Sequence, residues 1–146
     1  MIYFKTDFSE AFNLTNLMIQ NINTLNEVLK NQGKERLKAS NKASFKQQRS
    51  PDGEVWEKSK LSQIDPTGSP RLTMIRSTNL IQDTQNDSNY IINNNSLKEF
   101  SNAQSEKGFL YGQYWNEKKW TFAGFDIENI KNFQEDIVNH VFKGIK

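Results

Sequence analysis

The first part of the chain carries apolar side chains at roughly every third or fourth position, which is the spacing of an amphipathic helix. We expect this helix to begin at Glu10, because Ser9 is a favourable N-cap residue. Frequent Asn and Thr residues allow a break between residues 21 and 24, so two consecutive helices fit the pattern as well as one. The apolar positions of the pattern are Phe8, Phe12, Met18, Ile22, Leu25 and Leu29.

Between residues 25 and 48 the composition still favours helix, but apolar positions become sparse. A glycine inside a helix costs about 1 kcal/mol relative to alanine, so Gly33 is expected to mark a bend. Proline cannot continue a helix, and the sequence Ser50-Pro51-Asp52-Gly53 favours a turn. We therefore expect this second helix to end before the turn, and to be half solvated or packed on another chain.

The second half of the chain alternates short apolar runs with turn signals, a pattern typical of short strands. The segment from Leu97 to Lys107 predicts a short helix that ends at Gly108. Residues 112–119 predict a loop that carries exposed aromatic side chains. Strands are expected at residues 79–84, 90–93, 109–111 and 120–123, the first two forming a hairpin.

The clearest prediction is a final helix that Asp126 caps. Before the expected strands, residues 57–79 hold proline and glycine with few apolar positions, which predicts an extended loop or arm with a short helix at 72–77. The final helix has a regular apolar stripe formed by Ile127, Ile130, Phe133, Ile137, Val138 and Val141.

These elements predict a single α+β domain over residues 1–146. It would have N-terminal amphipathic helices, an antiparallel sheet of about four strands, and a C-terminal helix packed on the sheet. Its expected parts are a helical segment at 1–49, the loop or arm at 57–79, a sheet region at 80–125 and the helix at 126–143.

Composition narrows the classes of protein that fit. The apolar fraction of 35% is low, so the chain has long solvated segments or completes its burial against other subunits. The absence of cysteine excludes disulfides, thiolate metal sites and thiol nucleophiles. No apolar run is long enough to cross a membrane, and the first residues lack the pattern of a signal peptide. We therefore expect a chain that folds in a cytoplasm and has no membrane partner.

The sequence offers no catalytic constellation. His140 is the only histidine, and without a neighbouring cluster of ligands it predicts a structural role. Glu135 and Asp136 are adjacent, so on a helix they project about 100° apart and do not form a catalytic pair. We expect no catalytic residue, no metal site and no cofactor, and hence a protein that is not an enzyme.

A row of lysines is the main electrostatic feature. Seven basic residues and one acidic residue lie between residues 30 and 49. One interpretation is contact with DNA phosphates or with an acidic partner; the favoured one is a solvated helix face, because few aromatic residues are interleaved with the charges. The row places a lysine at every fourth position: Lys30, Lys34, Lys38, Lys42 and Lys46.

Aromatic residues cluster between residues 111 and 120. Such clusters are typical of protein–protein hot spots, and they are equally typical of the core of a small sheet. Both interpretations stay open for Tyr111, Tyr114, Trp115 and Trp120.

With these segments in view, the chain resembles the virion morphogenesis, or tail completion, family of Mu-like and P2-like bacteriophages. Ser50-Pro51-Asp52-Gly53 followed by Trp56 is similar to the family's Pro-Asp-Gly-x-x-Trp, and a polar helix precedes it, as in the family. Further similar segments occur in the same order at residues 75–80, 100–108 and 122–126. Two family positions differ: Gln104 replaces a histidine, and the nearest basic residue before Phe122 is Lys119.

The resemblance implies a structural virion protein at the tail end or head–tail junction: a tail completion, terminator or neck protein that works as a homo-oligomeric ring. Its partners would be copies of itself and other phage neck or tail proteins, with passing contact with DNA, after assembly in the host cytoplasm. The alternative is a nucleic-acid-binding module that uses the lysine row. The residues expected to form the assembly interface or its scaffold are Pro51, Asp52, Gly53, Trp56, Phe100, Gly108, Trp115, Phe122 and Gly124.

Two substitutions would rank these interpretations. We expect Trp56→Ala to damage folding or assembly, because a large apolar anchor is lost. Lys38→Ala should be nearly silent unless the lysine row is an interface.

Overall fold

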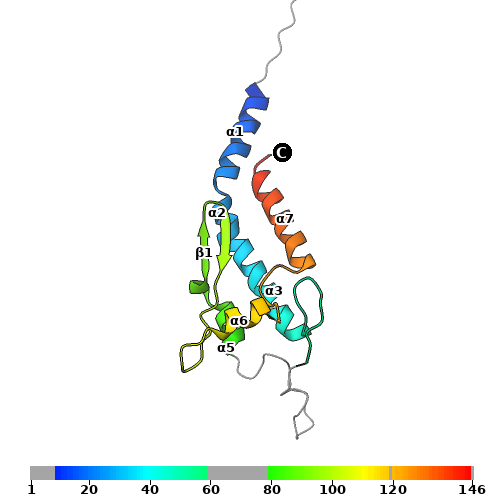
Figure 1. Ribbon diagram of the computed structural model, residues 1–146. Helices are drawn as coiled ribbons and strands as arrows, with labels where there is room; N and C mark the ends of the chain where they lie inside the picture. The colour runs from blue at the N-terminus through cyan, green and yellow to red at the C-terminus, as the bar shows by residue number, and fades with distance from the viewer. Residues whose placement is uncertain (1–8, 59–78, 119, 146) are drawn as a thin grey trace, which may run out of the picture.

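A computed structural model describes residues 9–58, 79–118 and 120–145 of the protein. The central element of the fold is a long, segmented helical rod (Figure 1). It consists of α1 (Ser9–Asn23), α2 (Leu25–Val28), the π-helical turn η1 (Leu29–Gly33) and α3 (Lys34–Gln47). Thr24 interrupts the rod between α1 and α2. Of the two alternatives that the sequence left open, the structure has the two consecutive helices.

The expected irregularity at Gly33 takes the form of the π-helical turn that this residue ends. A side chain at Gly33 would lie 3.0 Å from the ring of Phe133 on the last helix. That ring in turn stacks on Phe125, with 5.6 Å between the ring centroids. Glycine at this position therefore lets the last helix approach the rod closely.

The rod ends in the turn that the sequence predicted. Gln48 adopts a left-handed conformation with φ of 55° and donates its backbone N–H to the carbonyl of Ser44. The backbone N–H of Gly53 donates to the carbonyl of Ser50 over 2.8 Å, closing the four-residue turn. Gly53 has φ of 95°, which a residue with a Cβ adopts only under strain.

The chain then forms α5 (Asn79–Gln85), the 3₁₀ turn η2 (Asp87–Asn89) and a hairpin of β1 (Tyr90–Asn93) and β2 (Ser96–Glu99). The strands are antiparallel, with Tyr90 opposite Glu99 and Asn93 opposite Ser96. Asn94 and Asn95 connect them with φ of 48° and 57°. Two consecutive residues with positive φ are the requirement of the tight hairpin turn, and asparagine tolerates it.

This hairpin corrects two predictions. Residues 79–84 were expected to be a strand and form α5 instead, while the predicted strand at 90–93 is confirmed but pairs with β2. The predicted helix from Leu97 to Lys107 is wrong, because its first residues form β2 and the rest are irregular. The two-asparagine turn decides the pairing partner, since it joins adjacent strands directly.

The predicted sheet of about four strands is also wrong: the part of the chain that the structure describes holds one sheet of two strands. The expected loop at 112–119 is largely the helix α6 (Tyr111–Lys118), and residues 109–111 and 120–123 are not strands. Residues 122 and 123 do not pair with another strand of the described residues, because the side chain of Asn116 binds their backbone N–H groups. Asn116 Oδ1 accepts the backbone N–H groups of both Phe122 and Ala123, each over 2.9 Å.

The last helix, α7 (Ile127–Val141), is confirmed together with its cap. The carboxylate of Asp126 accepts the backbone N–H of Asn129 over 2.7 Å. Its predicted packing on the sheet is wrong, because α7 contacts α1, α2, η1 and α3. In Figure 1 the hairpin lies along one side of the rod and α7 along the other.

The overall class is thus mixed α+β, with the principal core at the C-terminal end of α3. The predicted loop or arm at 57–79 and the short helix at 72–77 fall on residues 59–78, which lie outside the described residues, apart from the loop's end residues. The buried cluster of the core consists of Phe45, Trp56, Leu80, Ala103, Trp120 and Phe122.

Two phenylalanines on the rod test where its stability resides. Phe45 is 1% exposed, whereas Phe12 is 67% exposed. Phe45→Ala should reduce the free energy of unfolding by about 3–5 kcal/mol, because it leaves a cavity in the core. Phe12→Ala, the matched control, should change it by less than about 0.5 kcal/mol. Urea unfolding of both variants measures the difference, and equal losses would contradict this account of the core.

Candidate assembly interface

Five of the residues singled out from the sequence meet at one place, where α3 ends. The ring of Phe45 on α3 lies between Trp56 and Phe122, with centroid distances of 5.7 Å and 5.1 Å. Gly124 has φ of 143°, and a side chain there would lie 3.4 Å from the ring of Pro51. Pro51, Gly53, Trp56, Phe122 and Gly124 therefore form one scaffold around the end of the rod.

Trp56 connects the turn to the segment before α7. Its indole N–H donates both to Ser50 Oγ and to the carbonyl of Thr121, each over 3.1 Å. Its backbone N–H donates to the carbonyl of Gln48 over 2.9 Å. Because the ring is buried and its N–H is satisfied, Trp56 fixes the position of the turn and is not itself a contact surface.

Beside this scaffold the surface is hollowed. Asp52 is at the rim of an apolar depression of about 370 Å³, and its carboxylate accepts the backbone N–H of Glu54 over 3.3 Å. The other residues around the depression are Pro51, Thr121, Ala123, Phe125, Ile127 and Ile130.

Phe100, Gly108 and Trp115 lie outside that scaffold. Phe100 is exposed after β2, and Gly108 closes a turn by donating its N–H to the carbonyl of Ser105 over 2.8 Å. Trp115 packs against the core and forms the middle of a chain of rings that runs from buried Trp120 to exposed Tyr114, at 4.9 Å on each side. The aromatic cluster is thus core at one end and surface at the other.

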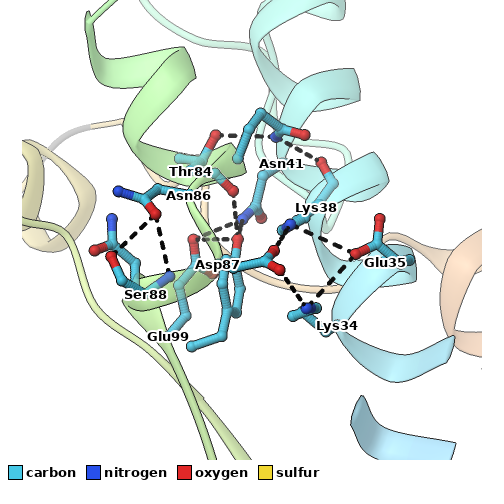
Figure 2. A network of polar contacts seen from close by, with 12 residues as sticks. Lys34, Glu35, Lys38, Asn41, Thr84, Asn86, Asp87, Ser88 and Glu99 are labelled. Atoms are coloured by element: carbon cyan, nitrogen blue, oxygen red, sulfur yellow. Dashed lines mark hydrogen bonds and ion pairs between the residues drawn. The ribbon is translucent and has the colours of Figure 1, made fainter. Parts of the chain in front are cut away.

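The lysine row is divided by its environment. The carboxylate of Asp87 forms ion pairs with both Lys34 and Lys38, and its Oδ2 lies 2.9 Å from Lys34 Nζ (Figure 2). Glu35 lies 3.5 Å from Lys38 Nζ as well. Lys38 is 8% exposed, and its ammonium lies 5.7 Å from the centroid of the Tyr90 ring. Only Lys30, Lys42 and Lys46 of the row are exposed.

This environment corrects the expectation for Lys38. Lys38→Ala is expected to be nearly silent on a solvated helix face, unless the lysine row is an interface. The buried stem and the contacts with Asp87 and Glu35 instead make the residue part of the packing between α3 and η2.

Behind the ion pairs lies a buried polar cluster. Asn41 donates to Glu99 Oε1 over 2.7 Å, and the Tyr90 hydroxyl donates to the carbonyl of Thr84. Burial raises the pKa of Glu99, although hydrogen bonds from Asn41 and Tyr90 partly oppose the shift. Burial and the nearby Glu99 carboxylate also raise the pKa of Tyr90. These contacts make the cluster a connector between α3 and the hairpin.

The remaining titratable candidates are structural as well. His140 Nε2 lies 2.8 Å from Thr24 Oγ1 and 3.0 Å from the carbonyl of Asn21, so it joins α7 to α1. Asp136 accepts two hydrogen bonds from the guanidinium of Arg36, at 2.9 Å and 3.2 Å. Glu135, in contrast, lies on the exposed side of α7.

Both α1 and α7 carry large apolar side chains that are exposed, and neither helix has a buried residue. Every residue from 9 to 16 is exposed. Asn21 explains how α1 is held, because its amide donates to the carbonyls of Val141 and Lys143 over 2.9 Å and 3.0 Å. The large exposed apolar side chains on these helices and the turn after α7 are Phe12, Leu14, Ile19, Ile22, Ile127, Ile130, Val138 and Phe142.

Comparison with protein-family models, with curated proteins and with solved structures found no match for this chain. Across residues 9–58, 79–118 and 120–145, no group of three or more His, Asp or Glu side chains is placed to hold a metal ion. In the same residues no helix has both the length and the apolar character needed to cross a bilayer.

Sequence reasoning missed the acceptors of the lysine row and the exposed side of α7. Asp87 is 49 residues from Lys38 in the chain, and no local pattern connects the two. The apolar stripe of α7 was recognised but assigned wholly to the core. The width of the stripe could have indicated a second, exposed face, since Ile127 and Val138 cannot share one narrow face of the helix with Phe133.

Asp87 allows a test of the network by pH. Hydrogen bonds from Lys38 and then Lys34 lower its pKa from 3.8 to about 2. A carboxylate whose pKa is lowered in the folded state stabilises the fold at pH values above its ordinary pKa of 3.8. This stabilisation is lost as the pH falls through about 2. Asp87→Asn should therefore be less stable than wild type at pH 7, with the difference shrinking between about pH 4 and pH 2.

Urea unfolding at a series of pH values measures this difference. Glu106→Gln is the control, because it also removes one carboxylate but from an exposed site. A difference between Asp87→Asn and wild type that stays constant from pH 7 to about pH 2 would contradict the ion pairs as the cause.

Proposed function

We propose that this protein is a structural subunit of a homo-oligomeric ring that acts at the tail end or head–tail junction of a bacteriophage virion. The single observation that carries the assembly part is the pair α1 and α7. These are two fifteen-residue amphipathic helices with no buried residue and with large apolar side chains in water. Exposed apolar surface of this extent is typical of protein–protein contact sites.

The outer part of α1 supports the same proposal. Isolated helices shorter than about 12–15 residues are marginally stable in water. The exposed segment from residue 9 to 16 is only about two turns long and carries Phe12 and Leu14. A neighbouring subunit that covers these side chains would stabilise the segment.

The phage assignment is supported by the resemblance of the Pro51-Asp52-Gly53-x-x-Trp56 segment and of the segments that follow it in the family's order. The scaffold around Trp56 is compatible with a rigid building block, because it fixes the turn to the rod and to the segment before α7. The clusters around Asp87 and Glu99 consist of hydrogen bonds and ion pairs that join α3 to η2 and the hairpin, which favours a structural role over an enzymatic one.

A nucleic-acid-binding module is the second candidate. Lys30, Lys42 and Lys46 are exposed and favour it, while Lys34 and Lys38 are engaged by Asp87 and weaken it. If three lysines contacted duplex phosphates, affinity would fall with salt with a logarithmic slope of roughly −3. Absence of binding to duplex DNA at low salt would remove this candidate.

The virion location has a direct test. If the proposal holds, antibody labelling and electron microscopy should place the protein at one end of the tail, in purified virions or in assembly intermediates. Purified protein mixed with tails that lack it should then complete them. Absence from particles and intermediates alike would contradict the proposal.

A further inference from the structure

The side of α7 that faces away from the rod forms one continuous surface. Its inner side is occupied, because Phe133 contacts Gly33, Asp136 pairs with Arg36, and His140 contacts Thr24. Among residues 9–58, 79–118 and 120–145 the outer side has no such neighbour: Ile127 is 66% exposed and Val138 is 53% exposed. In Figure 1 this helix lies at the edge of the molecule.

Two shallow hollows follow this outer side of α7. One of about 370 Å³ borders Ile127 and Ile130 near the start of the helix. The other, of about 380 Å³, is bordered by Lys131, Gln134, Glu135, Val138 and Asn139. Exposed apolar side chains beside hollows on one helix can interlock with the same features on a second helix, in the way that helices pack ridge into groove.

The charged residues on α7 favour a second copy of the same helix as the partner, and they favour an antiparallel orientation of the two helices. From the N-terminal to the C-terminal end of α7 and its following turn, the exposed charged residues are Glu128, Lys131, Glu135 and Lys143. The signs therefore alternate as negative, positive, negative, positive. Reversing this order places each charge against its opposite, whereas a parallel copy would place like charges together.

We propose that the outer side of α7 is a twofold, antiparallel interface with a second copy of this chain. With the axis beside Gln134 and Glu135, Lys131 of each copy lies opposite Val138 of the other. Glu135 of that copy is then about one helical turn away, within reach of the long lysine side chain. Glu128 then lies near Lys143 of the other copy, and Ile127 near its Phe142. This contact is isologous and so closes on itself as a dimer.

The proposed dimer does not rest on the phage assignment. It is also a contact additional to the one that would form a ring. A ring needs a contact that relates each subunit to the next, which an isologous dimer does not provide. The side of α1 that carries Phe12, Ile19 and Ile22 stays available for such a contact. A pair of helices each about 22 Å long buries less than the roughly 800 Å² per partner of a standard interface. We therefore expect a weak dimer whose population depends on concentration.

Charge reversal tests the arrangement. Lys131→Glu places glutamates against Glu135 of the other copy, and Glu135→Lys places lysines against Lys131 of the other copy. Each single variant should weaken dimerisation by about tenfold or more. The double variant, with both substitutions, should recover the dimer. An equimolar mixture of the two single variants should also recover it, as a heterodimer in which every pair is again opposite in sign.

Sedimentation equilibrium of the full chain measures these dissociation constants. Circular dichroism melting checks that each variant folds, because a single reversal also places like charges one helical turn apart within α7. Recovery in the mixture separates the interface from that internal effect, since mixing leaves each chain's own helix unchanged. Lys98→Glu, on the exposed side of the hairpin, is the control for altered net charge and should dimerise like wild type.

Three results would overturn the proposal. The first is a wild-type chain that stays monomeric up to about 1 mM, which would leave the surface to a different partner. The second is an oligomer that neither single reversal weakens. The third is a failure of the mixed single variants to associate better than each variant alone. Location of the protein in virions is measured separately, so the two proposals fail independently.

Discussion

Asn41 is the point at which three parts of the chain meet, and its amide is 0% exposed. Its Nδ2 donates to the buried carboxylate of Glu99 on β2, and its Oδ1 accepts the backbone N–H of Gly124, over 2.7 Å and 3.2 Å. The amide therefore joins the rod, the hairpin and the segment that leads into α7. A buried carboxylate without such donors carries a large desolvation cost. Removing this one side chain would affect all three parts together.

Ser40, the preceding residue, extends the same junction. Its hydroxyl donates to the carbonyl of Gly124 over 2.6 Å and accepts the N–H of Asp126 over 2.7 Å. Asp126 in turn caps α7. The direction in which α7 leaves the core is thus set by two adjacent polar residues on α3. This explains why a helix with sparse apolar positions can hold the fold together, since it contributes specific hydrogen bonds in addition to Phe45.

Local signals were sufficient for the parts of the fold that depend on neighbouring residues. The break near Thr24, the turn at Ser50 to Gly53 and the Asp126 cap are each encoded within a few residues. The predictions failed where distant groups decide the outcome. Residues 120–123 have the composition of a strand, yet the side chain of Asn116 accepts the backbone N–H groups of Phe122 and Ala123 in place of a neighbouring strand. Asn94 and Asn95 form the turn of the observed hairpin, whereas the predicted hairpin paired residues 90–93 with residues 79–84.

The same limit applies to the candidate site. Five lysines at equal spacing look alike in the sequence, but Asp87 engages two of them and leaves Lys30, Lys42 and Lys46 in water. Whether a lysine is a packing residue or a free charge depends on what the fold places opposite it. Equal spacing therefore indicates a helix face, and it does not identify a binding surface.

The distribution of apolar residues couples the stability of this chain to its assembly. With an apolar fraction of 35%, the monomer still exposes Phe12, Ile19, Ile127 and Val138 on its two long amphipathic helices. A partner that binds only the folded state raises the free energy of unfolding as its concentration rises above the dissociation constant. Covering these side chains would therefore stabilise α1 and α7 most, because they have no buried residue of their own. The core around Phe45 would gain little, since it is complete within the single chain.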